Sequence, residues 1–196
     1  MATLTELLAD VYTITNRPDL VNETKLAVKA ATLKAHQSDF FYKDIEESGV
    51  SFSTSDYVQA LEYRSIFPNY RALKYIRKTD VAGVPGDFLS VITPALSLDR
   101  YGEEKTDICY GAGAVIQIKS STLLQYILLG YYKNPVLTDA GYSSWVALDH
   151  PYYIVYEAAC QIFKTKGQDE QATIYNKLAM EQLMLLKASN IEIEGV

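Results

Sequence analysis

Two pairs of adjacent carboxylates, Glu46-Glu47 and Glu103-Glu104, are the side chains of this chain that most resemble an acid–base site. A glycan hydrolase needs two carboxylates that face one glycosidic bond. Neighbouring residues of a strand point to opposite faces of the sheet, so neither pair forms a ready-made site. We interpret both pairs as solvated acids. One alternative stays open, a glycan hydrolase used at cell entry with Glu46 or Glu47 as its acid.

Metal, nucleophile and phosphate chemistry has equally few candidates. His36 and His150 are the only histidines, and neither has a Cys, Asp or Glu at metal-ligand spacing, so helix-end roles are favoured. Cys109 and Cys160 lie far apart in apolar contexts, which predicts reduced core thiols. No serine lies in a G-x-S-x-G sequence, and the glycines at 111–113 lack the Lys-Ser/Thr of a phosphate loop. The sequence therefore predicts no catalytic residue, no metal site and no cofactor, and indicates that the chain is not an enzyme.

The formal net charge of −6 disfavours a protein that grips nucleic acid. Lys25, Lys29 and Lys34 share one face of an expected helix, and lysines in such a row are usually solvated. The arginines near aromatic residues favour structural pairing; these are Arg64, Arg71 and Arg77. A packaging factor that binds nucleic acid through these cations is the second alternative.

Residues 1–39 are expected to form N-terminal helices that pack with a helical hairpin at the C-terminal end. Thr3 and Glu6 match a capping box. A second helix is expected from Leu20 or Asn22 to Gln37, with an apolar stripe at Leu26, Ala30 and Leu33 and with Ala27 and Ala31 beside it.

Residues 40–136 are short apolar runs separated by turn residues, which predicts an antiparallel β module. The sequence of residues 84–87 predicts a type II turn, and the glycines at 111–113 predict a hairpin. Residues 122–133 suit a strand or a helix; we favour a strand that is central or covered by another chain, because it is apolar on both faces. The expected strands are 40–45, 50–52, 57–62, 72–78, 88–92, 108–110, 115–119 and 122–133, with a helical turn at 94–100.

Residues 137–190 are expected to form a loop and a helical hairpin. Pro151 suits the first position of a helix that is capped by Asp149 or His150. Gly167 suits a residue of positive φ after that helix, and Asp169 suits the cap of the next helix. Residues 191–196 form a tail whose alternation of apolar and acidic residues favours an extended segment. The stripes are expected at Tyr152, Val155, Tyr156, Ala159, Ile162 and Phe163, and at Ala172, Tyr175, Leu178, Ala179, Leu185 and Leu186.

These patterns predict the fold class α+β, in which N-terminal helices and a C-terminal helical hairpin flank an antiparallel β module. No apolar run reaches the ~20 residues of a membrane helix, and no signal peptide is recognisable, so synthesis in the cytoplasm and no membrane partner are expected.

Several segments in this order resemble the head–tail adaptor (connector) proteins of short-tailed bacteriophages. The resemblance runs over nearly the whole chain, and the closing segment PYYIVYEAACQIFKTKGQDEQA is its most specific part. A chain that ends a few residues after Asn190 departs from adaptors with a long C-terminal arm. The other segments are TITNRPDLVNETKLAVKAATLKAHQSDFF, FPNYRALKYIRK, EKTDICYGAGAVIQIKSS, LLGYYKNPVLT and YSSWVALDH.

The resemblance implies a virion protein of the neck, between head and tail. It implies a ring of about twelve copies under the portal protein that continues the DNA channel and docks tail nozzle or fibre proteins, while DNA passes without specific binding. The family shares no general catalytic residues. We expect an acidic or neutral channel surface, with Glu103 and Glu104 as candidates.

The residues expected to make contacts lie near the end of the chain and in the β module. Met180, Leu183 and Met184 widen the apolar surface of the last helix beyond its stripe, which indicates a second partner. The expected portal contacts are Leu185, Leu186, Lys187, Ile191, Ile193 and Val196. The expected contacts between copies are Met180, Leu183, Met184, Tyr131 and Tyr132.

Overall fold

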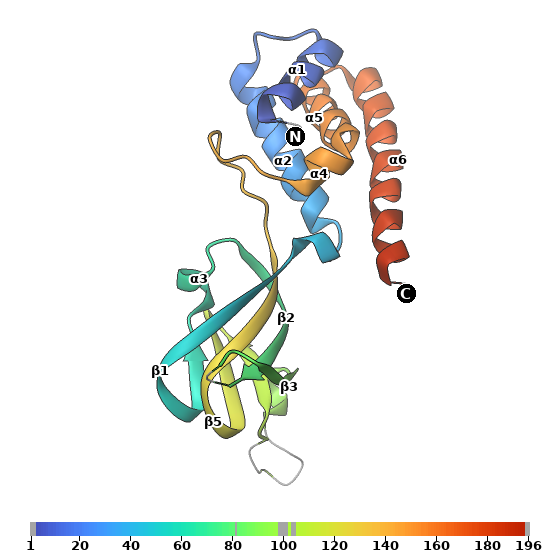
Figure 1. The fold of residues 1–196 in the computed structure, drawn as a ribbon. Coiled ribbons are helices and arrows are strands. Elements are labelled where there is room, and N and C mark those ends of the chain that lie inside the picture. The colour runs from blue at the N-terminus through green and yellow to red at the C-terminus, as the bar shows by residue number, and fades with distance from the viewer. Residues whose placement is uncertain (1–2, 81, 98–101, 103–104, 195–196) are drawn as a thin grey trace. The chain divides into compact units, whose positions relative to one another are not determined.

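The computed structural model describes residues 3–80, 82–97, 102 and 105–194, with side chains up to residue 190. The chain divides into two compact units. Residues 1–44 and 134–196 form the helical unit, and Ile45–Lys133 form the β unit. Along the chain, helices precede and follow the strands of one sheet, and the expected α+β class is confirmed (Figure 1). The β unit lies inside the expected β module of residues 40–136, and both chain ends contribute to one helical unit.

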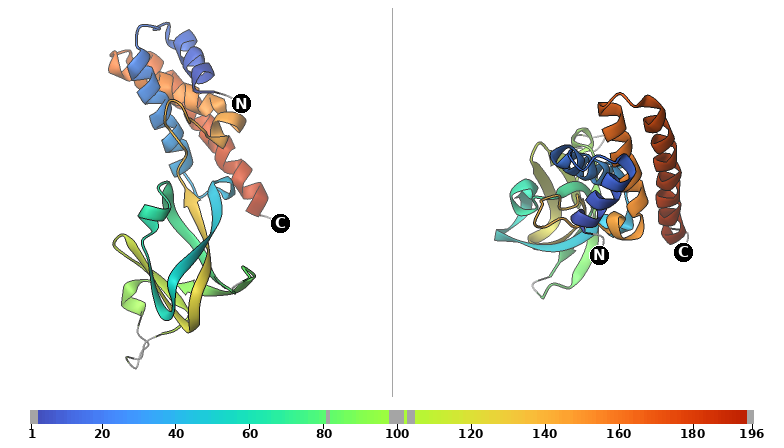
Figure 2. Two further views of the ribbon diagram at one scale, coloured as in Figure 1. Left: turned by 60° about the vertical axis from the view of Figure 1, so that its left-hand side comes forward. Right: turned by 90° about the horizontal axis from the view of Figure 1, so that it is seen from above.

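The helical unit is built around one central helix. Its elements are α1 (Leu4–Thr15), α2 (Val21–Gln37), the short 3-10 turn η1 (Tyr42–Asp44), α4 (Trp145–Asp149), α5 (Pro151–Thr165) and α6 (Asp169–Glu194). Helix α5 packs against α1, α2, α4 and α6. Figure 2 shows α5 and α6 side by side as an antiparallel hairpin.

The ends of these helices follow the local sequence. The capping box is confirmed, because Thr3 N donates to Glu6 Oε2 at 2.7 Å and Glu6 N donates to Thr3 Oγ1 at 3.2 Å. Pro151 occupies the first position of α5, as expected. Gly167 adopts the expected left-handed conformation, with φ at 68°. Helix α6 begins at Asp169 itself.

The expected apolar stripes of α2, α5 and α6 are each wrong in part; in α6, Leu185 is 57% exposed. In α2, Leu26 is 70% exposed, and small residues face the core instead. In α5, Tyr152 is 58% exposed, although the rest of its expected stripe is buried or half-buried. Helix α5 lies at the centre of the unit, so its neighbours on several sides cover more than one stripe of the helix. The buried small residues of α2 are Thr24, Ala27, Val28, Ala31, Thr32 and Ala35.

The β unit is a five-stranded sheet that closes on itself through its longest strand. Its elements are β1 (Ile45–Leu61), α3 (Tyr63–Ile66), β2 (Tyr70–Thr79), β3 (Pro85–Val91), η2 (Pro94–Leu96), β4 (Ile108–Ala112) and β5 (Val115–Lys133). The strand order is β1-β5-β2-β3-β4, and β4 also pairs with β5. Strand β5 is thus central, and the expectation of a strand at residues 122–133 is confirmed. The pairing of β3 with β4 is parallel, unlike the expected purely antiparallel module.

Several expected boundaries in the β unit are wrong. Residues 42–44 form η1 instead of a strand, and the two expected strands at 50–52 and 57–62 are parts of the single strand β1. Pro85 and Gly86 lie in β3, so no type II turn lies there; the turn before it includes Gly83, with φ at 81°. The hairpin between β4 and β5 is confirmed, because Ala112 pairs with Val115.

Gly130 allows an aromatic ring to lie on the backbone of β5. A Cβ atom at this position would come within 2.4 Å of the Tyr75 ring. That ring is held by a hydrogen bond from its hydroxyl to Glu47 and by an edge contact with Phe88, at 5.5 Å between ring centroids. Glycine is therefore required here for close packing, with no need for a positive φ.

Replacing Gly130 by alanine is expected to destabilise the β unit by about 1–3 kcal/mol, because the Tyr75 ring must leave its position. Urea denaturation followed by circular dichroism measures this loss. The control is Gly111→Ala, since a Cβ there meets no atom within 4 Å. Equal stability of the two variants would contradict the packing role of Gly130.

Both cysteines are free and buried, as expected from the sequence. Cys109 lies in the core of the β unit, and Cys160 lies in α5, where its thiol donates to Ala172 O at 3.3 Å. Burial raises the pKa of the Cys109 thiol to about 11, so this group stays protonated and unreactive at neutral pH.

Candidate docking surfaces of the helical unit

A buried hydrogen-bond network joins three segments of the helical unit. His36 Nδ1 lies 2.6 Å from Asp44 Oδ1, and His36 Nε2 lies 2.9 Å from Ser144 Oγ. Trp145 Nε1 donates to the same Asp44 oxygen at 2.7 Å. The order Ser–His–Asp is that of a hydrolase triad, so a nucleophilic role must be weighed.

The surroundings of Ser144 favour a structural role for this network. Ser144 is 8% exposed, and its Oγ accepts a hydrogen bond from Ala147 N at 3.3 Å, as an N-cap of α4. His36 and Asp44 are 2% and 1% exposed. A hydroxyl that caps a helix and is almost closed to solvent is poorly placed to attack a substrate. We therefore interpret the network as a link between α2, η1 and α4.

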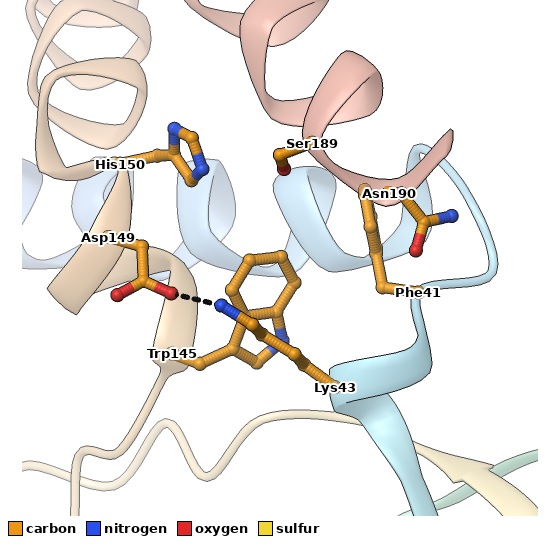
Figure 3. A pocket seen from close by; sticks show the side chains of 7 residues that line it. All are labelled: Phe41, Lys43, Trp145, Asp149, His150, Ser189 and Asn190. Atoms are coloured by element: carbon orange, nitrogen blue, oxygen red, sulfur yellow. Dashed lines mark hydrogen bonds and ion pairs between the residues drawn. The ribbon is translucent and has the colours of Figure 1, made fainter. Parts of the chain in front are cut away.

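A pocket of about 250 Å³ lies beside this network, at the end of α6. Figure 3 shows its seven lining side chains, which come from η1 and the residue before it, from α4 and the residue after it, and from the last turns of α6. Lys43 Nζ donates to Asp149 Oδ2 at 2.5 Å and lies 5.1 Å from the centre of the Trp145 ring. The full lining set is Phe41, Lys43, Trp145, Asp149, His150, Ser189 and Asn190.

The end of α6 is fixed to this pocket by Asn190. Its amide donates to Phe40 O at 3.3 Å and accepts from Tyr42 N at 3.3 Å. Asn190 is 7% exposed, so the compact fold extends at least this far. Burial and the Lys43 ammonium lower the pKa of His150, while the Asp149 carboxylate opposes this. The imidazole is therefore neutral at pH 7.

The outer face of α6 carries large exposed apolar side chains. Met184 is 71% exposed, Leu185 is 57% exposed and Met180 is 39% exposed. Leu183 is half-buried and packs against the core of the helical unit. Of the expected contact residues, these four and the half-buried Lys187 retain surface that a partner could cover.

Other expected contact residues lie in the core. Leu186 is 0% exposed and packs against the other helices, while Tyr131 and Tyr132 of β5 are 5% and 6% exposed. Their apolar area is used within the chain, so the structure does not support them as contacts. Helix α6 continues to Glu194, so the expected extended segment at Ile191 and Ile193 is wrong. Val196 lies outside the described residues.

The candidate cations are occupied by ion pairs. Lys25 and Lys29 both contact the Asp139 carboxylate, at 3.2 and 2.5 Å, and Lys34 contacts Glu157 at 2.7 Å. Sequence reasoning missed both acids, because they lie more than a hundred residues away along the chain. The three lysines are thus not an open phosphate-binding row.

The candidate acids are also accounted for where the structure describes them. A hydrogen bond from Lys133 lowers the pKa of Glu46, so this carboxyl is ionised at neutral pH and cannot donate a proton. Glu47 accepts from the Tyr75 hydroxyl. Glu103 and Glu104, expected at a channel surface, lie outside the described residues.

No family model and no curated protein matches this chain. Within the described part of the chain, no helix has the length and apolar character to span a membrane. The same residues contain no group of three or more His, Cys, Asp or Glu side chains that could hold a metal ion.

Proposed function

We propose that the protein is a structural phage head–tail adaptor that forms a ring under the portal, continues the DNA channel and docks tail components. The resemblance of its sequence suggests this role. The observation that carries it is the outer face of α6, where Met184 and Leu185 expose most of their apolar area. Methionine adapts to imperfectly matched partners, which suits an interface with other subunits.

The portal contact is proposed at the end of α6 and the residues that follow Asn190. The pocket beside Asn190 is lined by the aromatic rings of Phe41 and Trp145 and by the charged group of Lys43. Apolar rings with a polar rim are typical of interface pockets. A helix end beside such a pocket suits insertion into a groove of a partner.

A chain truncated after Asn190 is expected to keep its fold and to lose most of its affinity for the portal. The cut must follow Asn190, because its amide holds the backbone of Phe40 and Tyr42. A cut after Lys187 would remove this contact and also disturb the fold. The control is Asn190→Ala in the full chain. It separates the effect of the Asn190 hydrogen bonds from the effect of the residues that follow Asn190.

Native mass spectrometry of the protein, alone and mixed with its cognate portal, measures the effect. We expect a ring on the portal for the full chain and at least a tenfold loss of binding for the truncated chain. If the truncated chain still assembles on the portal with unchanged affinity, the portal contact lies elsewhere in the chain. A full chain that does not bind the portal at all would refute the proposed function.

The two alternative functions have less support. A glycan hydrolase with Glu46 as acid is disfavoured by the lowered pKa of this carboxyl. A packaging factor that binds nucleic acid through Lys25, Lys29 and Lys34 is disfavoured by their pairing with Asp139 and Glu157. A glycan-degradation assay and a salt titration of DNA binding would each reveal the corresponding activity.

A further inference from the structure

A second surface of the helical unit is a groove between α2 and α6, with α5 as its floor. Its volume is about 370 Å³. Its apolar lining comes from Ala30 and Leu33 of α2 and from Leu183 of α6. Lys34 lies at the same groove, with its side chain 49% exposed. Ala30 and Leu33 belong to the stripe that the sequence assigned to the core, so their exposure needs an explanation.

The floor of the groove holds an unsatisfied hydroxyl. Tyr153 lines the groove and is 1% exposed, and its hydroxyl has no hydrogen-bond partner among the described residues. Burial and the nearby Glu157 carboxylate raise the pKa of Tyr153, so the hydroxyl remains a proton donor. A buried donor without an acceptor is unfavourable. An occupant of the groove that offers an acceptor would remove this penalty.

The opposite side of α6 carries a ridge that matches this groove in chemistry. Ile174, Leu178, Glu181 and Leu185 follow the i, i+4, i+7, i+11 spacing of one helix face. Ile174 is 53% exposed, Leu185 is 57% exposed, Glu181 is exposed and Leu178 is half-buried. The ridge thus has apolar ends and one carboxylate between them.

Groove and ridge lie on different sides of the same helix. At about 100° per residue, Leu185 lies about 200° around α6 from Leu183, which lines the groove. The ridge therefore cannot occupy the groove of its own chain. A contact between two different surfaces of identical chains is head-to-tail, and it produces a ring or an open filament.

We propose that the groove of one copy binds the Ile174–Leu185 ridge of a second copy, with Glu181 of the ridge between Lys34 and the Tyr153 hydroxyl. This contact rests on the proposed function, because it supplies the joint from which a ring would be built. Lys34 already contacts Glu157, but an ammonium group has three donors and can bind a second carboxylate. The Tyr153 hydroxyl gains a charged acceptor, which forms stronger hydrogen bonds than a neutral one. Charge and apolar area are therefore complementary across the contact.

Disulfide trapping of the full-length protein tests the contact without a portal. A chain with both Ala30→Cys and Leu185→Cys is oxidised at high concentration, and the products are separated by size. We expect a ladder of multimers, because each head-to-tail contact links one copy to the next. The native Cys109 and Cys160 are buried and do not interfere.

The matched control is a chain with Ala30→Cys and Met184→Cys, in which the second cysteine lies about 100° away around the helix. Trapping should be about tenfold faster for the Leu185→Cys chain, since the contact raises the effective concentration of the two thiols. Equal rates, a faster control, or dimers without a ladder would overturn the proposed contact.

A second variant probes the hydroxyl itself. Tyr153→Phe should leave the melting temperature of the free protein unchanged or higher, because it removes an unsatisfied group. In the trapping chain, the same substitution should slow multimer formation about tenfold, because the hydrogen bond to Glu181 is lost. A lower melting temperature with an unchanged trapping rate would contradict the role of Tyr153.

The results separate this contact from the proposed function. A ladder from a protein that does not bind the portal would support the contact and refute the adaptor role. Portal binding without a ladder would support the adaptor role and overturn the proposed contact between copies.

Discussion

Replacing Asp44 by alanine is expected to lower the free energy of unfolding of the helical unit by about 3 kcal/mol. The Asp44 carboxylate accepts from Trp145 Nε1 at 2.7 Å and contacts His36 Nδ1 at 2.6 Å; His36 and Asp44 are buried and Trp145 is half-buried. Removing the carboxylate leaves both donors without their acceptor, and a buried donor left this way costs about 1–3 kcal/mol. The shorter side chain also leaves a cavity.

Urea denaturation followed by tryptophan fluorescence measures this effect. Trp145 is the single tryptophan of the chain and lies in the network, so its emission reports on the helical unit alone. The control is Asp10→Ala, which removes an exposed carboxylate from α1 and should change stability by less than about 0.5 kcal/mol. Equal stability of the two variants would mean that the network does not hold α2, η1 and α4 together.

The sequence predicted the ends of α1 and α5 better than the face that α2 buries. The capping residues Thr3 and Glu6, the proline that begins α5 and the glycine that ends it act through nearest neighbours, so their roles are visible in a short window. The buried face of α2 was predicted wrongly, because Leu26 is more apolar than alanine or threonine and was therefore placed in the core. Small residues at helical spacing were the available signal, and they allow α2 to pack closely on α5.

The network around His36 could not be predicted from spacing. Asp44 is eight residues from His36, but Ser144 is 108 residues away, and the fold alone brings them together. In the sequence both residues look like ordinary loop or capping residues. The same reason hid the pairing of Lys25 and Lys29 with Asp139. The exposure of Met180 and Met184, in contrast, followed from counting more apolar residues on α6 than one stripe can bury, whereas Leu185 was wrongly placed in the buried stripe.

The long strands β1 and β5 show a different limit. The sequence suggested two short strands within each of them, because polar residues such as Ser53, Thr54, Ser120 and Ser121 interrupt the apolar runs. Half of a strand in an exposed sheet can be polar without breaking its pairing. In β1, the register with β5 shifts near Ser51 and Asp56, and β1 continues through these irregularities.

Replacing Ala159 by phenylalanine is expected to destabilise the α5–α6 hairpin by about 1–3 kcal/mol. Ala159 and Ala179 are both fully buried, and Ala159 belongs to a cluster with Cys160, Phe163 and Ala172. The bond from Cys160 Sγ to Ala172 O, at 3.3 Å, shows how closely the two helices approach there. A phenyl ring in this space must push the helices apart or adopt a strained rotamer.

The control for Ala159→Phe is Ala188→Phe, which places the same side chain on an exposed position of α6. It changes helix propensity by a similar amount, about 0.5 kcal/mol, without filling the contact. Thermal unfolding followed by circular dichroism should show a melting temperature several degrees lower for Ala159→Phe than for the control. Equal melting temperatures would show that the hairpin can open at this point at little cost. In that case α6 would be held mainly by its other contacts, such as the buried Leu186 and the hydrogen bonds of Asn190. The outer ridge of α6 would then lack the rigid support that a contact between copies requires.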